Sequence, residues 1–202
     1  MTPEQRAGIV DAVARRVSAQ RMQHILRVEA LAVKLARFWG LPEEKASIAA
    51  LLHDVAREEP VADLTALVQQ CDDPWIRDLG QTPAALVLHA PAGAVIAKRD
   101  FGISDPEVLK AIALHTTGAP GMSRLAMIIF LADYCEPGRH FRGIGEVRAL
   151  LYTSLEAAML AALTQTLAYV RSKALPVDPH TAAAAADFQR LAAGPSPLPP
   201  EP

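Results

Sequence analysis

The chain is poor in aromatic residues, which make up 5% of its 202 residues, and it contains only two cysteines. Cys71 and Cys135 lie far apart without a Cys-x-x-Cys spacing, which argues against a disulfide framework. A net charge of −2 gives no basic surface of the kind that nucleic acid or an anionic membrane requires. The chain also lacks a signal segment and any run of about 18 apolar residues. We therefore expect a cytoplasmic protein with no nucleic-acid or membrane partner.

The residues that are abundant favour helices. Hydrophobic residues make up 51% of the chain and charged residues 21%, which is typical of a globular protein. Alanine and leucine dominate and extended β-branched runs are few, so we expect an all-α fold. No linker divides the chain, and we expect one domain over residues 1–193. Residues 194–202 contain five prolines and are predicted to form a disordered tail.

Apolar periodicity and helix start and stop signals predict the individual helices. The expected ranges are 3–18, 19–38, 43–57, 60–71, 91–101, 105–115, 124–133, 145–152, 154–174 and 182–193. Residues 75–88 show no clear pattern, and 83–88 fit either a short helix or a strand. Residues 176–181 are expected to be a break between the last two helices.

The helix that follows Pro42 ends in two adjacent ionisable residues, His53 and Asp54. Placing them at the end of so apolar a run costs free energy unless something pairs with them. A divalent metal ion is the strongest available partner, because it takes a neutral imidazole nitrogen and a carboxylate oxygen together. Because neighbouring helical side chains point about 100° apart, such an ion also needs ligands from other helices.

Four more residues of ligand type lie in or beside apolar helices: His24, His89, His115 and Asp133. Each has an ordinary explanation when taken alone. A histidine that faces the core is more often a buried neutral residue than a ligand. Asp133 could instead form an ion pair with Arg139 or Arg142. The recurrence of all six residues at apolar helix ends is what predicts a metal centre.

The order of these residues resembles that of the HD superfamily of metal-dependent phosphohydrolases, and longer motifs resemble the YqeK family within it. The motifs span residues 21 to 148. They are Arg21-Met22-Gln23-His24, His89-Ala90-Pro91-Ala92-Gly93-Ala94, His115-Thr116-Thr117-Gly118 through Met122-Ser123, Ala132-Asp133-Tyr134, and Glu136-Pro137-Gly138-Arg139-His140-Phe141-Arg142-Gly143.

The resemblance implies an HD-type helical bundle that cleaves diadenosine tetraphosphate symmetrically into two ADP, by attack of a hydroxide that bridges two metal ions. It implies iron, with manganese or another divalent ion as a substitute. The implied metal ligands are His24, His53, Asp54, His89, His115 and Asp133, with Asp54 bridging. The implied catalytic residues are Asp54, Asp133 and Arg57, and the implied substrate-binding residues are Arg21, His24, His89, His115, Thr116, Asp133, Arg139, Pro176 and Thr181.

Two features depart from the family pattern. Arg57 stands where many HD enzymes have lysine, which keeps the charge but changes its geometry. Asp178 and the alanines of 182–186 replace residues that are more polar in the family, which affects the expected base recognition. The oligomeric state, including whether the chain forms a homodimer, stays open.

Three other interpretations remain at this point. An HD phosphodiesterase or nucleotidase could act on another nucleotide, such as a cyclic dinucleotide, although the Gly-Tyr-Pro signature of one such branch is missing. A catalytically silent nucleotide-binding regulator would keep the same residues. A helical protein with ordinary core histidines would leave the six residues together unexplained.

Overall fold

Helices account for all of the regular secondary structure in residues 1–193, the part of the chain that the computed structural model describes. The predicted disordered tail, 194–202, lies outside the described residues. The helices are α1 (Pro3–Ala14), α2 (Ala19–Phe38), α3 (Glu43–Leu52), α4 (Val61–Gln69), α5 (Pro74–Leu79), the 3-10 turn η1 (Ala85–Val87), α6 (His89–Phe101), α7 (Pro106–Leu114), α8 (Arg124–Cys135), α9 (Ile144–Leu150), α10 (Leu155–Ser172) and α11 (Pro179–Ala193). The all-α prediction is confirmed. None of the helices in this range could cross a membrane.

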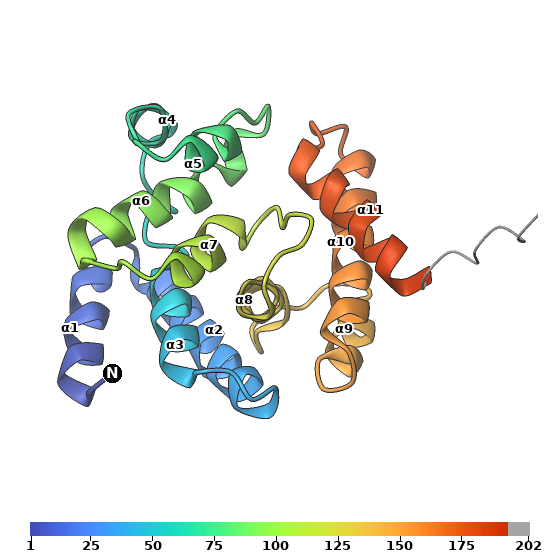
Figure 1. Cartoon of the computed structure of the whole chain (residues 1–202), viewed down its shortest axis with the longest axis horizontal. Coiled ribbons are helices and arrows are strands. Elements are labelled where there is room, and N and C mark those ends of the chain that lie inside the picture. The colour runs from blue at the N-terminus through green and yellow to red at the C-terminus, as the bar shows by residue number, and fades with distance from the viewer. Residues whose placement is uncertain (194–202) are drawn as a thin grey trace, which may run out of the picture.

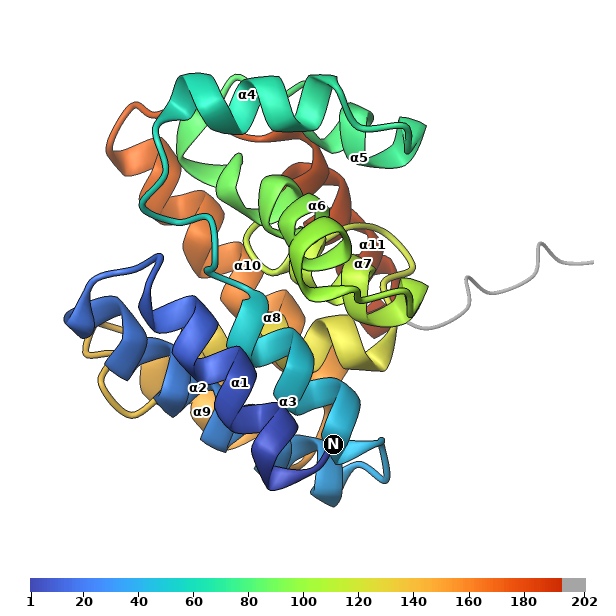
Figure 2. The same cartoon turned by 90° about the vertical axis from the view of Figure 1, so that its left-hand side faces the viewer.

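The helix α8 lies at the centre of the arrangement (Figure 1). Its residues 125–132 are all buried, which explains why this is the most apolar run of the sequence. The antiparallel helices α2 and α3 pack on one side of it, α7 on another, and α9 and α10 on a third. Viewed from the side, α4 and α5 lie above α6, away from α2 and α3 (Figure 2). The fold therefore surrounds α8 with helices on several sides.

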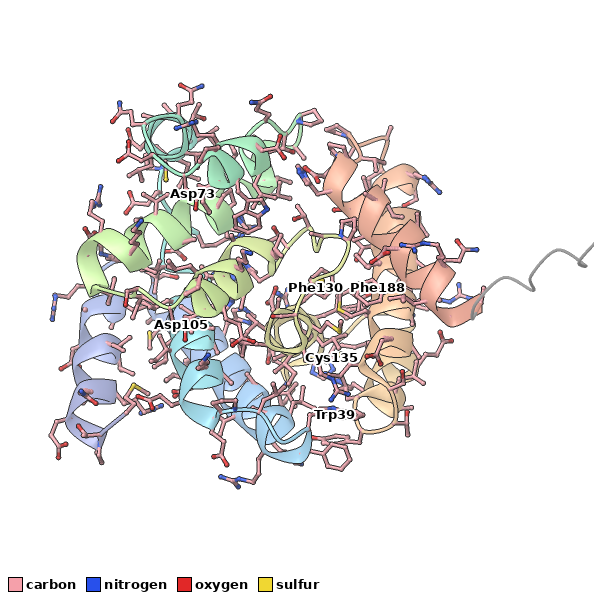
Figure 3. All side chains as sticks on the ribbon, viewed as in Figure 1. Trp39, Asp73, Asp105, Phe130, Cys135 and Phe188 are labelled. Atoms are coloured by element: carbon pink, nitrogen blue, oxygen red, sulfur yellow. The ribbon has the colours of Figure 1, made fainter. Side chains whose placement is uncertain are left out.

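Side-chain caps fix several helix starts. Asp73 and Asp105 accept hydrogen bonds from backbone N–H groups in the first turns of α5 and α7 (Figure 3). Ser123 caps α8 in the same way. Because the first N–H groups of a helix have no partner within it, these side chains supply one. At the other end of α2, the Trp39 indole donates to the Leu151 carbonyl and ties α2 to the chain before α10.

Several predicted helix ends are wrong. Helix α1 stops at Ala14 instead of residue 18, and α11 begins at Pro179 instead of residue 182, so part of the expected break is helical. Asp178 explains the early start, because its Oδ1 accepts the N–H groups of His180 and Thr181. Residues 74–79 form a helix that the sequence did not reveal, and 85–87 form a 3-10 turn rather than a strand.

The most consequential correction concerns the end of α3, which stops at Leu52 instead of continuing to residue 57. Beyond it the backbone forms successive turns closed by i to i+3 hydrogen bonds, such as Arg57 N–H to the Asp54 carbonyl. Gly93 of α6 packs against this segment, and a Cβ there would lie 3.3 Å from the His53 carbonyl oxygen. The small residues of α6 thus let it approach the end of α3.

Candidate metal centre

Six ionisable side chains from five separate segments meet at one place beside α8. His24 comes from α2, His53 and Asp54 from the turn after α3, His89 from the start of α6, His115 from the end of α7, and Asp133 from the last turn of α8. All are buried except Asp133, which is half-buried. Residues of this kind are rarely buried without partners. The structure thus places together all six residues predicted as metal ligands.

Asp54 lies at the centre of this cluster, and its two carboxylate oxygens face different histidines. Oδ2 lies 3.5 Å from His53 Nε2 and 3.7 Å from His24 Nε2. Oδ1 lies 3.3 Å from His89 Nε2 and 3.6 Å from His115 Nε2. A carboxylate with a pair of imidazoles on each oxygen has the arrangement needed to bridge two cations.

Asp133 completes the side of the cluster that faces Asp54 Oδ2. Its Oδ1 lies 3.0 Å from His24 Nε2 and 4.0 Å from His53 Nε2. The candidate ligand atoms form two sets, and within each set all atoms lie within 4.8 Å of one another. One set comprises His24, His53 and Asp133, and the other comprises His53, Asp54 and His115. His53 belongs to both sets.

The histidines are oriented so that each Nε2 points into the cluster. The Nδ1 atoms of His53, His89 and His115 donate to the backbone carbonyls of Ala50, Leu86 and Ile112, at 2.7 to 2.9 Å. A carbonyl only accepts, so Nδ1 carries the proton and Nε2 keeps a lone pair. The Nε2 atoms of His24 and His53 are buried without a hydrogen-bond partner. Buried lone pairs beside carboxylates suit a divalent metal ion.

The electrostatics of the cluster agree with this chemistry. Burial opposes ionisation of Asp54, but the surrounding imidazoles, His53 first, outweigh it and hold the pKa of Asp54 well below its usual value. Burial lowers the pKa of His89 to about 4, so this imidazole is neutral at pH 7, as a ligand must be. Burial also disfavours the charged form of His53, yet the neighbouring charge of Asp54 raises its pKa above the ordinary value.

The two arginines predicted to bind substrate lie at the edge of the cluster. Arg21 Nη1 lies 2.8 Å from Asp54 Oδ2, and Arg139 Nη2 lies 2.7 Å from Asp133 Oδ1. The ion-pair interpretation of Asp133 is therefore correct in naming Arg139 as a partner. Arg57, predicted to be catalytic, lies instead beside His89, with its Nη1 3.3 Å from the Leu86 carbonyl oxygen that also accepts from His89.

The other three predicted substrate-binding residues line one cavity next to the cluster. Thr116, Pro176 and Thr181 border a mostly apolar space of about 280 Å³, together with 83–87, Leu167 and Val170. Thr116 Oγ1 and Asp178 Oδ2 are buried at this cavity without hydrogen-bond partners. An apolar space with a few unpaired polar atoms is a suitable site for a flat heterocycle. Sequence inspection treated Asp178 only as a departure from the family pattern.

Sequence inspection also missed two residues of a second cavity beside the cluster. Arg27 and Glu136 line a second, polar cavity of about 280 Å³ with Arg21, His24 and Arg139. Burial opposes ionisation of Glu136, but the hydrogen bonds from Arg27 and other donors lower its pKa to about 2. The signal that could have found Arg27 is its position three residues after His24, which places both on one helix face.

Comparison with known proteins agrees with the geometry. The HD domain model matches residues 21–138. The symmetrical bis(5′-nucleosyl)-tetraphosphatase of Halalkalibacterium halodurans is 37% identical over 171 residues, which cover 83% of this chain and 88% of that protein. The protein of the same name from Bacillus subtilis is 36% identical, covering 84% of this chain and 89% of that protein.

A solved structure shares the fold. The crystal structure of a predicted HD superfamily hydrolase involved in NAD metabolism, from Clostridium acetobutylicum, is 35% identical and superposes with a TM-score of 0.82, covering 91% of this chain and 96% of that chain. The resemblance seen in the sequence motifs is confirmed along most of the chain. Helical architecture, buried His/Asp cluster and relatives together show that the chain belongs to the HD domain family and is homologous to the symmetrical bis(5′-nucleosyl)-tetraphosphatases.

Proposed function

We propose that this protein is a symmetrical bis(5′-nucleosyl)-tetraphosphatase that hydrolyses diadenosine tetraphosphate to two ADP. The observation that carries the proposal is the buried cluster of four imidazoles and two carboxylates, in a chain that covers most of the length of relatives named for this activity. The reaction consumes one water. Its oxygen bonds to a phosphorus beside the central bridging oxygen, the bond from that phosphorus to the bridge breaks, and ADP leaves.

The cluster is the proposed binding site for two divalent cations, with iron as the family resemblance implies. His24, His53, Asp54 and Asp133 would hold one ion, and His89, His115 and the second oxygen of Asp54 the other. The division of imidazoles between the two Asp54 oxygens supports this assignment. When bound, such ions lower the pKa of water and neutralise phosphate oxygens.

The arginines at the edge of the cluster are the proposed phosphate contacts. A tetraphosphate carries several negative charges, and guanidinium groups bind phosphate oxygens with two parallel hydrogen bonds. Arg21 and Arg139 lie against the two cluster carboxylates, so they stand where a phosphate chain would meet the site. Arg57 is the proposed source of positive charge beside His89. In this scheme the protein acts by placement and charge stabilisation.

The apolar cavity is the proposed site of one nucleoside, with Thr116, Pro176 and Thr181 as its contacts. Adenine presents an amino group that donates hydrogen bonds, and two residues that line the cavity each carry a buried oxygen without a hydrogen-bond partner, Thr116 Oγ1 and Asp178 Oδ2. The cavity adjoins the cluster because Thr116 directly follows His115. A nucleoside held there would extend its phosphates toward the cluster.

The test is to incubate the protein with diadenosine tetraphosphate and iron or manganese and to separate the nucleotides by chromatography. We expect ADP as the sole nucleotide product, and no turnover after treatment with a chelator. Release of AMP with ATP would contradict symmetrical cleavage. Absence of turnover with either metal, despite metal binding, would contradict the substrate assignment.

A further inference from the structure

Glu136 is a buried carboxylate in contact with one histidine of the cluster. Its exposed fraction is 1%, and its Oε1 lies 3.1 Å from His24 Nδ1. The residues are 112 positions apart in the sequence, on α2 and just after α8. A carboxylate accepts and does not donate, so His24 Nδ1 carries the proton and its Nε2 keeps the lone pair that faces Asp133.

The hydrogen-bond partner of His24 Nδ1 differs in kind from the Nδ1 partners of the other three histidines. His53, His89 and His115 each donate to a backbone carbonyl three residues earlier, a partner that any sequence supplies. The Nδ1 of His24 is held by a side chain instead. We infer that Glu136 is the positioning residue of His24, fixing its tautomer and ring orientation and thereby setting the affinity for the cation held with His53 and Asp133. This inference rests on the proposed metal site.

Glu136 is itself held on both oxygens. Arg27 Nε lies 2.6 Å from Oε2 and Arg27 Nη2 lies 3.2 Å from Oε1, while the Gly138 N–H donates to Oε2 at 2.5 Å. A Cβ on residue 138 would lie 2.8 Å from the Arg27 guanidinium nitrogens, so glycine leaves the room that Arg27 occupies. Arg27, Gly138 and Glu136 therefore form one hydrogen-bonded network, and Glu136 connects this network to His24.

Every group around the two Glu136 oxygens is a hydrogen-bond donor. Glutamine has the same shape, but its NH2 group would have to face either His24 Nδ1 or the Arg27 and Gly138 donors. In the first case His24 would be driven to the other tautomer, with a proton on Nε2. In the second case the network that holds residue 136 would be broken. An amide therefore cannot replace the carboxylate.

The chain offers a matched control in Glu29, which also lies on α2. Glu29 is buried, its two oxygens bind Arg6 through Nε and Nη2, and Ser47 donates to one of them. The arginines of the two pairs are similarly exposed, at 44% for Arg6 and 40% for Arg27. Glu29 makes no contact with the cluster among the described interactions. Glu29→Gln therefore reproduces the loss of a buried Arg–Glu pair without touching His24.

The experiment is a Mn²⁺ titration of chelator-treated wild type, Glu136→Gln and Glu29→Gln, with free Mn²⁺ followed by electron paramagnetic resonance and thermal stability measured in parallel. We expect two binding steps in wild type and in Glu29→Gln. In Glu136→Gln one step should weaken by about 10–100-fold, the usual effect of removing a carboxylate that supports a ligating histidine, while the other is unchanged.

The outcomes separate the possible failures. A purely structural role would lower thermal stability in both variants and leave Mn²⁺ affinity unchanged, which would overturn the inference about Glu136. Absence of Mn²⁺ binding by wild type would instead overturn the proposed metal site. If Glu136→Gln fails to fold, Arg27→Gln with Arg6→Gln as its control decides. Weakening of one step only in Arg27→Gln supports the inference, and equal affinity in the two variants contradicts it.

Discussion

At the scale of single residues, the site depends on buried polar groups that cannot all form hydrogen bonds with one another. His53 is fully buried, its Nε2 has no hydrogen-bond partner, and it contributes to both sets of candidate ligand atoms. Asp54 is the carboxylate shared between the two pairs of imidazoles. These two residues are therefore the most sensitive points of the proposed metal centre.

Replacing either residue with alanine should abolish metal binding and hydrolysis. Loss of a supporting carboxylate near a metal usually costs about 10–100-fold, so loss of a ligand shared by two sites should reduce turnover by more than about 100-fold. Metal content by mass spectrometry and ADP release by chromatography measure the two effects. His140→Ala, at an exposed histidine, is the control. Normal turnover in His53→Ala or Asp54→Ala would contradict the site assignment.

The two cysteines should differ sharply in reactivity. Burial raises the pKa of Cys135 to about 12, so below that pH the thiol is protonated and the nucleophilic thiolate is scarce. Cys71 is only half-buried. At pH 8 a thiol reagent such as Ellman's reagent should therefore modify one cysteine in the folded protein, and both in urea. Rapid modification of two thiols before unfolding would show that Cys135 is accessible.

At the scale of elements, the centre depends on how closely α6 approaches the end of α3. Gly93 makes that approach possible, since its missing Cβ would touch the His53 carbonyl oxygen at 3.3 Å and Ile112 at 3.5 Å. Both neighbours are themselves buried in the packed interior. A larger residue would push α6 away from the segment that carries His53 and Asp54.

Gly93→Val should destabilise the fold by about 1–3 kcal/mol, the usual cost of overpacking a core, and should weaken metal binding. Gly8→Val on α1 is the matched control, because a Cβ there meets nothing within 4 Å. Valine is a better helix former than glycine, so the control should be neutral or slightly stabilising. Urea unfolding of both variants measures the difference. Equal stability would mean that α6 and α3 have more room than the structure shows.

At the scale of the whole molecule, the six cluster residues come from α2, the turn after α3, α6, α7 and α8, and a cation bound by them would link these segments. Without a cation, the site leaves two imidazole nitrogens unpartnered and buried. A ligand that binds the folded state and not the unfolded state raises stability by mass action. Metal binding should therefore stabilise the whole arrangement of helices around α8.

Removing metal with a chelator should lower the melting temperature, and Mn²⁺ or Fe²⁺ should restore it. At a cation concentration of about 100 times the dissociation constant, the gain is about 2.7 kcal/mol. For a chain of this length that corresponds to a shift of about 5–10 °C. Differential scanning calorimetry measures it, with Mg²⁺ as a comparison that imidazole ligands disfavour. An unchanged melting temperature would contradict a metal that bridges these helices.

The sequence by itself determined the helical class, most helix positions and the residue types of the site. The bounds of α2 match the predicted range 19–38, which apolar periodicity indicated, and Ser18 caps its start in the structure. Patterns of this kind are local, because a helix buries residues three and four apart and a cap acts within one turn. The family motifs added the grouping of all six ligand-type residues, although their roles as ligands and iron as the metal stay predictions.

Only the tertiary structure decided which side chains meet. In the structure, Arg139 rather than Arg142 pairs with Asp133, and Arg57 lies beside His89. Helix α3 ends before His53. Glu136 contacts His24, which lies 112 residues away in the sequence. No local pattern encodes the contacts of Arg57 and Glu136, because each depends on how closely α2, α6 and α8 pack and on which donors that packing leaves buried. The sequence determines which chemical groups the site contains, and the packing of helices around α8 determines the distances between those groups.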